Sequence, residues 1–179
     1  MDVEKIRKLV LLEIQNNGMP TAVYAQLTAQ EKKCVEKKDA RHFVKQSCRQ
    51  KIRVVLTGGV FDILHAGHIV TLSEAKKLGD ILITVLARDE LIERTKKRTP
   101  IHSQEYRAMM VNALKPVDFA LVGFKNPADM LKRVKPDVIV YGYDQHVFLE
   151  PPGVVVVKLK KHLEKNKFKT NKIIKELGI

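Results

Sequence analysis

Short apolar runs alternate with amphipathic stretches from residue 51 onward, and this alternation is the clearest pattern of the chain. The apolar runs are rich in β-branched residues and predict five buried strands, at 53–56, 82–87, 119–122, 138–141 and 154–159. The stretches between and after them predict helices, at 68–78, 104–114, 127–133 and 172–177. Continuous apolar strands that alternate with helices are typical of a parallel sheet covered on both faces. We therefore expect an α/β fold with a Rossmann-like, doubly wound, five-stranded parallel sheet.

The first 50 residues follow a different pattern. One amphipathic helix is predicted at 6–14, and it ends near Asn17-Gly18. A second is predicted from Thr28 to Cys48, because Thr28 and Glu31 have the spacing of a capping box. No strand is predicted here. We expect a small helical N-terminal region at 1–50, of unknown role, and a second domain at 51–179. The helical region fits a helix-turn-helix-like module, a dimerisation arm or a cap on the sheet.

Composition and charge narrow the class of partner. The chain has 179 residues, 45% of them hydrophobic, and a formal net charge of +13, which favours anionic partners such as nucleotides or phosphorylated metabolites. No apolar run reaches the length of a membrane span, and the N-terminus is unlike a signal peptide. Cys34 and Cys48 lie outside any metal-type spacing. We expect a cytoplasmic protein with free thiols and no membrane partner.

The turn after the first predicted strand carries the strongest functional pattern. Residues 54–68 read as an apolar strand, a glycine turn and the start of a helix, which are the usual parts of a phosphate cradle. His65 and His68 are three residues apart on that helix start, so they can face one bound group. Histidine can donate to phosphate oxygens near neutral pH, and Gly67 lets the backbone approach a ligand. This combination predicts nucleotide chemistry.

The same turn argues against two common nucleotide-binding classes. It has neither the Gly-x-Gly-x-x-Gly of dinucleotide folds nor the Gly-Lys-Ser/Thr of the P-loop. A zinc site on the histidine pair is not expected, because no third ligand lies near it in the sequence. The other histidines, His42, His102, His146 and His162, are expected at the surface. In doubly wound sheets, ligands bind beyond the carboxyl ends of the strands, where 58–68, 88–89 and 142–145 would meet.

Residues 57–68 resemble the signature of the cytidylyltransferase-like nucleotidyltransferases, and within that group the archaeal FAD synthases, which adenylylate FMN. Further segments agree in order and spacing, at 87–90, 97–101, 105–107, 113–118 and 142–145. The resemblance implies transfer of AMP from ATP to FMN. CTP-dependent transfer to glycerol 3-phosphate or a similar phosphorylated alcohol stays open, although the Arg-Thr-x-Gly-Ile-Ser motif of that branch is absent. A nucleotide-sensing DNA-binding regulator is an alternative of another class.

The resemblance also implies roles for individual residues. His65, His68 and Lys97 would be catalytic. The nucleotide would be held by these histidines and by Thr57, Gly58, Gly59, Val60, Phe61, Ala66, Gly67, Asp144 and Thr170. The acceptor or a phosphate would be held by Arg88, Arg98 and Arg107. Asp62 is interpreted as a cap that fixes the turn. Mg²⁺ or another divalent metal is expected with the triphosphate, bound mainly by phosphate oxygens and water. A homodimer is expected from many relatives, and nucleic acid is not an expected partner.

Overall fold

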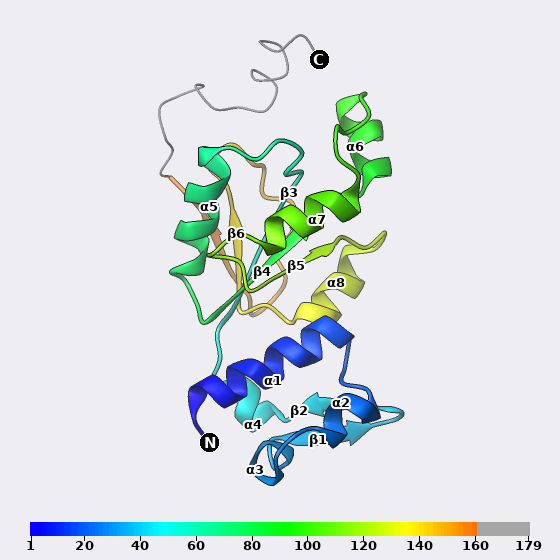
Figure 1. The fold of residues 1–179 in the computed structure, drawn as a ribbon. Coiled ribbons are helices and arrows are strands. Elements are labelled where there is room, and N and C mark those ends of the chain that lie inside the picture. The colour runs from blue at the N-terminus through cyan, green and yellow to red at the C-terminus, as the bar shows by residue number, and fades with distance from the viewer. Residues whose placement is uncertain (161–179) are drawn as a thin grey trace.

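A five-stranded parallel sheet forms the centre of the computed structural model, which describes residues 1–160 (Figure 1). Its strands stand in the order β5-β4-β3-β6-β7. Their bounds are Val54–Gly59 for β3, Ile81–Leu86 for β4, Phe119–Val122 for β5, Val138–Tyr141 for β6 and Val155–Lys158 for β7. All five lie where the sequence predicts a strand, so the predicted fold class is confirmed.

Both faces of the sheet are covered, as the apolar strands predicted. Successive residues of β3 point to opposite sides. Val55 lies in one core cluster with Leu72 of α5 (Ala66–Lys76) and Val111 of α7 (Gln104–Asn112). Its neighbours Val54 and Leu56 lie in a second cluster that includes Val134, the last residue of α8 (Pro127–Val134). The chain therefore winds helices onto each face in turn.

In the described residues after position 50, the structure has one helix that the sequence did not predict. One predicted helix lies outside the described residues. Residues 89–96 form α6 (Asp89–Lys96), a helix with one buried residue, Ile92. Its sequence is almost entirely polar, so it lacks the apolar periodicity on which the prediction relied. On α7, the large side chains of Tyr106 and Met109 are exposed. The helix predicted at 172–177 lies outside the described residues.

The N-terminal region is not purely helical, which corrects the prediction of a helix from Thr28 to Cys48. It consists of α1 (Val3–Asn16), α2 (Thr21–Ala25), α3 (Ala29–Lys32), the antiparallel strands β1 (Val35–Lys38) and β2 (Arg41–Val44), and α4 (Gln46–Arg49). The predicted capping box of Thr28 and Glu31 is present, but α3 is only one turn long. Asp39 takes a left-handed φ of 54° and turns the chain, so that Val35 and Val44 pair and are both buried.

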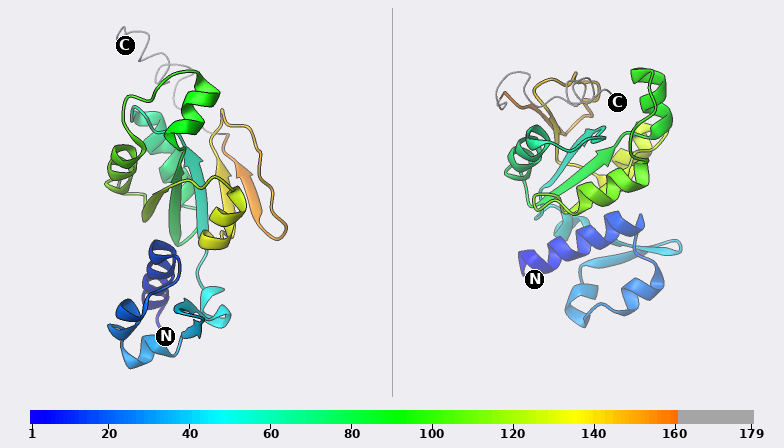
Figure 2. Two further views of the ribbon diagram at one scale, coloured as in Figure 1. Left: turned by 90° about the vertical axis from the view of Figure 1, so that its right-hand side faces the viewer. Right: turned by 45° about the horizontal axis from the view of Figure 1, so that its top comes forward.

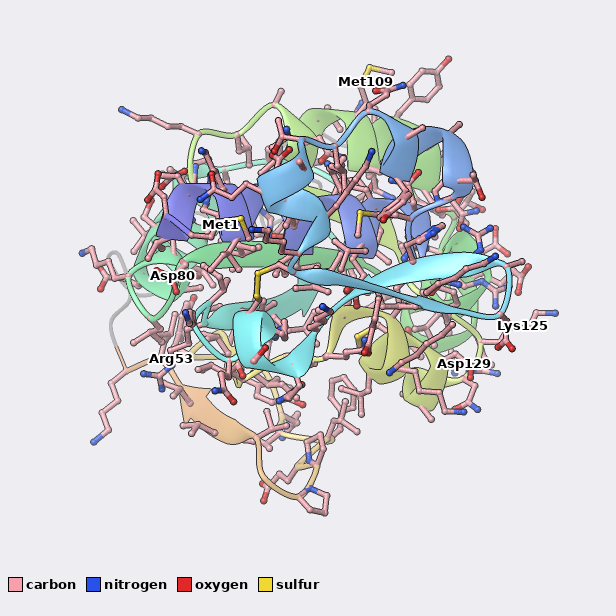
Figure 3. The ribbon with its side chains drawn as sticks, turned by 90° about the horizontal axis from the view of Figure 1, so that it is seen from below. Met1, Arg53, Asp80, Met109, Lys125 and Asp129 are labelled. Atoms are coloured by element: carbon pink, nitrogen blue, oxygen red, sulfur yellow. A yellow bond between two sulfur atoms is a disulfide. The ribbon has the colours of Figure 1, made fainter. Side chains whose placement is uncertain are left out.

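The two cysteines form a disulfide rather than the free thiols that the sequence suggested (Figure 3). Cys34 precedes β1 and Cys48 lies in α4, and both are buried, with their Cα atoms 5.9 Å apart. The hairpin between them brings the two positions together, which sequence spacing alone does not reveal. The bridge closes the base of the hairpin onto α4.

The N-terminal region packs against the end of the sheet where the strands begin (Figures 1 and 2). Ile6, Leu9 and Ile14 of α1 lie in the same core cluster as Val54 and Leu56 of β3. Polar contacts strengthen this junction, since the guanidinium of Arg133 donates to the carbonyl of Ile14 at 2.7 Å. No helix in residues 1–160 is long and apolar enough to cross a membrane.

Candidate functional site

The two histidines of the turn lie side by side at the carboxyl end of β3. His65 is the N-cap residue of α5, and His68 lies in its first turn. Their rings stack with centroids 3.9 Å apart and planes 24° apart. Within the described residues, the Nδ1 atom of each ring is buried without a hydrogen-bond partner. The two rings therefore lie together, as their spacing in the sequence predicted.

Burial keeps both imidazoles neutral near pH 7. Burial is the larger cause and the neighbouring His65 the smaller one, and together they lower the pKa of His68 from 6.5 to about 4. Burial also lowers the pKa of His65, while the carboxylate of Asp144 acts in the opposite direction. Neutral rings next to the N–H groups of a helix start can donate to an anion without the desolvation cost of a standing charge.

Close ring packing explains two glycines of the turn. A Cβ on Gly67 would lie 3.0 Å from the ring of His65, and a Cβ on Gly59 would lie 2.8 Å from the ring of Phe61. Phe61 is buried, takes a φ of 54° and places its ring 4.9 Å from that of His68. Gly67 thus leaves room for the ring of His65, and Gly59 leaves room for the ring of Phe61, which lies beside His68.

Asp62 fixes the turn to a second loop. Its buried carboxylate accepts hydrogen bonds from the backbone N–H of Ile101 at 2.8 Å and of His102 at 3.1 Å, and from the guanidinium of Arg98 at 2.6 Å. The interpretation of Asp62 as a structural cap is therefore confirmed. Lys97 ends α6 with a φ of 53° and is exposed. Its neighbour Arg98 brings this end of α6 toward the histidine turn.

Of the histidines expected at the surface, His42 is buried and His102 is only partly exposed. The Nδ1 atom of His102 lies 2.9 Å from the carbonyl oxygen of Asp62, so this ring is part of the loop contact. His42 is buried in the N-terminal region, where its ring stacks on Tyr24 with centroids 4.0 Å apart. His146 is exposed, as expected, and His162 lies outside the described residues.

Arg107 does not lie at the surface of the site, which corrects its expected contact with an acceptor or phosphate. Its side chain is fully buried. The guanidinium donates to the carbonyls of Val60 at 2.6 Å, Ala87 at 2.7 Å and His102 at 3.0 Å, and to the carboxylate of Asp89 at 2.5 Å. Arg107 therefore holds three loops together beneath the site, with its charge balanced by Asp89.

The segment after β6 is tied to the end of β3 by Gln145, which the sequence analysis included only as part of the segment 142–145. Its Nε2 donates to the carbonyl of Gly58 at 2.7 Å, and its Oε1 accepts from the N–H of Gly142 at 2.7 Å. The hydroxyl of Thr57 donates to the carbonyl of Val140 at 2.9 Å and joins the same two strands. Asp144 is exposed beside this bridge. An amide between two backbone segments has no signature in the sequence.

A cavity of about 610 Å³ opens at the carboxyl ends of β3, β4 and β6. Its volume lies within the range of pockets that hold small molecules. Gly58, Gly59 and Val60 line one side, so it adjoins the histidine turn, although the two histidines do not line it. Apolar and aromatic side chains form much of its wall, among them Leu91, Phe124, Met130, Tyr141, Phe148 and Leu149. Arg88 and Arg94 are its arginines, and Arg88 forms an ion pair with Glu90. These residues are scattered along the sequence, so no motif predicts them.

The described residues contain no group of three or more His, Cys, Asp or Glu side chains that could hold a metal ion. A divalent metal at this site would therefore depend on oxygen atoms of a bound ligand. Thr170, expected to contact the nucleotide, lies outside the described residues.

Comparison with known proteins gives consistent matches. Residues 56–177 match the family described as Cytidylyltransferase-like. The FAD synthase of Aciduliprofundum boonei is 47% identical over 136 residues, which are 69% of this chain and 88% of the relative. That of Pyrococcus horikoshii is 42% identical over 139 residues, which are 72% of this chain and 93% of the relative. A crystal structure of the lipopolysaccharide core biosynthesis protein from Thermoplasma volcanium superposes with a TM-score of 0.58 at 38% identity, over 62% of this chain and 98% of that chain.

Proposed function

The chain belongs to the cytidylyltransferase-like family, and on that premise we propose that it is an FMN adenylyltransferase, which transfers AMP from ATP to FMN. The products are FAD and pyrophosphate. The matches to the relatives named FAD synthase cover 88% and 93% of those relatives' own length. The family match at residues 56–177 includes the histidine turn.

The observation that carries the proposal is the stacked histidine pair beside an apolar cavity. His65 and His68 offer ring nitrogens at a helix start, which suits a triphosphate. The cavity of 610 Å³ begins on the other side of Gly58–Val60 and suits a flat, largely apolar group. Adenylylation of a flavin needs both features side by side, because the phosphate of FMN must reach the α-phosphorus of ATP.

In the proposed reaction, a phosphate oxygen of FMN attacks the α-phosphorus of ATP in line. A new P–O bond forms, the bond between the α-phosphorus and its bridging oxygen breaks, and pyrophosphate leaves with the electron pair. Such transfers depend on positioning and on stabilising charge more than on covalent participation of the protein. Neutral His65 and His68 would donate to the triphosphate and stabilise the charge that grows on the leaving oxygen.

The remaining site residues have supporting roles in this proposal. The backbone of Gly58–Phe61 and of Ala66–Gly67 would contact the nucleotide, with Asp144 near the ribose. Thr57 would act by joining the strands beneath the nucleotide. Lys97 and Arg98 would stabilise the departing pyrophosphate, and Arg98 is held toward the turn by Asp62.

The ring system of FMN would occupy the apolar cavity. Three aromatic side chains in its wall, Phe124, Tyr141 and Phe148, provide flat apolar surfaces of the kind that a tricyclic ring contacts. Arg88 lies in the same wall, near the end of β4, where it would meet the phosphate of FMN. This placement keeps the attacking phosphate close to the turn.

Magnesium would enter as part of the ATP substrate. The described residues provide no cluster of ligands for it, so phosphate oxygens and water would hold the ion, and no step of the reaction is assigned to a protein-bound metal.

A substrate matrix tests the proposal. Pyrophosphate release is measured with ATP or CTP, each combined with FMN or glycerol 3-phosphate, and FAD is identified by chromatography. We expect release and FAD formation only with ATP and FMN. Release only with CTP and glycerol 3-phosphate would replace the proposal by cytidylyl transfer. No release with any of the four combinations would overturn the assignment as a nucleotidyltransferase.

A further inference from the structure

The N-terminal region has the topology of a winged helix. Met19, between α1 and α2, pairs with His42 of β2 through two backbone hydrogen bonds of 2.8 and 2.9 Å. The order is therefore helix, short strand, two helices and a hairpin whose second strand pairs with the short strand. α2 and α3 are separated by three residues, 26–28, as in a helix-turn-helix pair, and buried Leu27 packs the turn inward. In helix-turn-helix modules that bind duplex DNA, the second helix of the pair enters the major groove.

The region contacts the rest of the chain mainly through α1, and also through Arg49 of α4, which pairs with Asp137. Arg7 pairs with Asp118, Arg133 donates to the carbonyl of Ile14, and Lys135 pairs with Glu13 at 2.7 Å. α2 and α3 lie on the side of α1 away from the sheet, and the hairpin projects to one side of α1 in the right-hand view of Figure 2. The region lies at the beginning of the strands, opposite the carboxyl ends where the histidines are (Figure 1). It contributes no residue to the candidate site, so its outer surface calls for a separate role.

The outer surface is basic. Residues 28–51 contain eight Lys or Arg and three Asp or Glu. Exposed basic residues follow α3 and the hairpin, at Lys33, Lys37, Lys38, Arg41 and Lys51. Of the three acidic residues, Glu31 is buried and bonded to Thr28 and Lys8, so it subtracts little from the outer charge. Exposed amides and hydroxyls, which also donate to phosphates, lie between the basic residues, at Gln26, Thr28, Gln30, Gln46 and Ser47.

We propose that residues 1–50 form a module that binds double-stranded DNA through α3 and the hairpin. Because α3 is a single turn, few side chains can reach base edges in the major groove. Binding therefore rests mainly on phosphate contacts of the lysines, so it depends weakly on sequence and strongly on salt. Figure 3 looks onto this surface from below, with the hairpin and α4 in front of the sheet.

The test measures the fluorescence anisotropy of a labelled DNA duplex of arbitrary sequence. Its length, about 25 base pairs, is chosen to exceed the footprint of the module. The full chain is titrated at several salt concentrations, with single-stranded DNA and a duplex RNA of the same sequence as comparisons. The test variant is Lys33→Gln/Lys37→Gln. The matched control is Lys77→Gln/Lys132→Gln, which removes the same charge from exposed positions of the catalytic domain.

We expect the Lys33→Gln/Lys37→Gln variant to bind duplex DNA about tenfold more weakly and to reduce the slope of log K against log salt by about 2, one for each lost phosphate contact. The control is expected to bind like the original chain. Equal losses in both variants would reduce the effect to overall charge and overturn the proposal. Tighter binding of duplex RNA, or no binding of DNA at low salt, would also overturn it.

The adenylyl transfer of the same variants provides an independent check of folding. Neither pair of lysines belongs to the candidate site, so both variants are expected to keep the rate of the original chain. The DNA-binding proposal does not rest on the proposed enzyme activity. If the original chain shows no adenylyl transfer, the folding of the variants is checked by their thermal unfolding instead.

Discussion

At the scale of single residues, the stacked rings of His65 and His68 are the centre of the candidate site. The spacing of His65 and His68 predicts that they face one site, because i and i+3 positions meet on a helix, and the stacked rings confirm it. Asp62 was interpreted correctly from its place in a tight turn. Arg107 was not, because an arginine near a phosphate site is equally compatible with binding a ligand and with joining buried carbonyls. Only its burial distinguishes the two.

Replacing His68 by alanine should separate catalysis from binding. The variant loses donation to the charge that grows in the transition state, so we expect kcat to fall by about 10²-fold or more, with a smaller change in KM. The measurement is steady-state FAD formation, with the melting temperature as a check of folding. His146→Ala, at an exposed position, is the control and should retain full activity. A loss confined to KM would contradict a catalytic role.

The lowered pKa of His68 predicts how stability depends on pH. The pKa of His68 is about 4 in the folded chain, whereas the ordinary value of 6.5 applies to the unfolded chain. The unfolded chain therefore binds the proton more readily. The contribution of this residue to the free energy of unfolding is complete above pH 6.5 and is lost as the pH falls toward 4. Denaturant unfolding between pH 7.5 and 4.5 measures it. His68→Gln should flatten this part of the curve, and an unchanged curve would contradict the assignment.

At the scale of elements, predictability followed the apolar pattern. The five strands are short, continuous apolar runs, and α5, α7 and α8 are amphipathic stretches between them, so their positions were predicted within a few residues. α6 is mostly polar, and the hairpin of β1 and β2 consists largely of charged residues. Their structures depend on a turn at Asp39 and on tertiary contacts, which a hydrophobic pattern does not contain.

Asp118 connects three elements, so its replacement should destabilise the fold. Its carboxylate accepts from Arg7 of α1, from Lys76 of α5 at 2.5 Å and from the N–H of Leu82 in β4 at 2.6 Å. Asp118→Asn removes the charge from these contacts, and we expect a loss of about 2 kcal/mol in the free energy of unfolding, measured with denaturant. Asp129→Asn is the control. Its exposed pair with Lys132 spans 3.9 Å, so a change of about 0.5 kcal/mol or less is expected. Equal effects would contradict the connecting role.

At the scale of the whole molecule, the sequence predicted the edge of the sheet where the site lies but not its cavity. The rule that ligands bind beyond the carboxyl ends of parallel strands placed the turn, Arg88 and Asp144 correctly at one edge. The apolar wall was not predictable, because Phe124, Tyr141 and Phe148 become neighbours only after the sheet has formed. The disulfide of Cys34 and Cys48 was missed for the same reason.

The shared core predicts that the catalytic domain depends on the N-terminal region. Ile6, Leu9 and Ile14 cover one end of the core beneath Val54 and Leu56. A chain that begins at Lys51 exposes this apolar surface, so we expect a lower melting temperature and a tendency to aggregate, seen by calorimetry and size-exclusion chromatography. Leu9→Ala in the full chain is a graded version, with an expected loss of about 2–5 kcal/mol. A truncated chain that melts like the original would contradict the shared core.

Because all five strands run in the same direction, the two ends of the sheet can carry different functions. The winged-helix topology lies where the strands start, and the histidines lie where they finish. A molecule anchored by its lower end on a long polyanion would thus keep its upper end open to small substrates arriving from solvent. DNA binding and turnover would use different surfaces, so neither would block the other. The flavin product would leave from the end of the molecule opposite the bound polyanion.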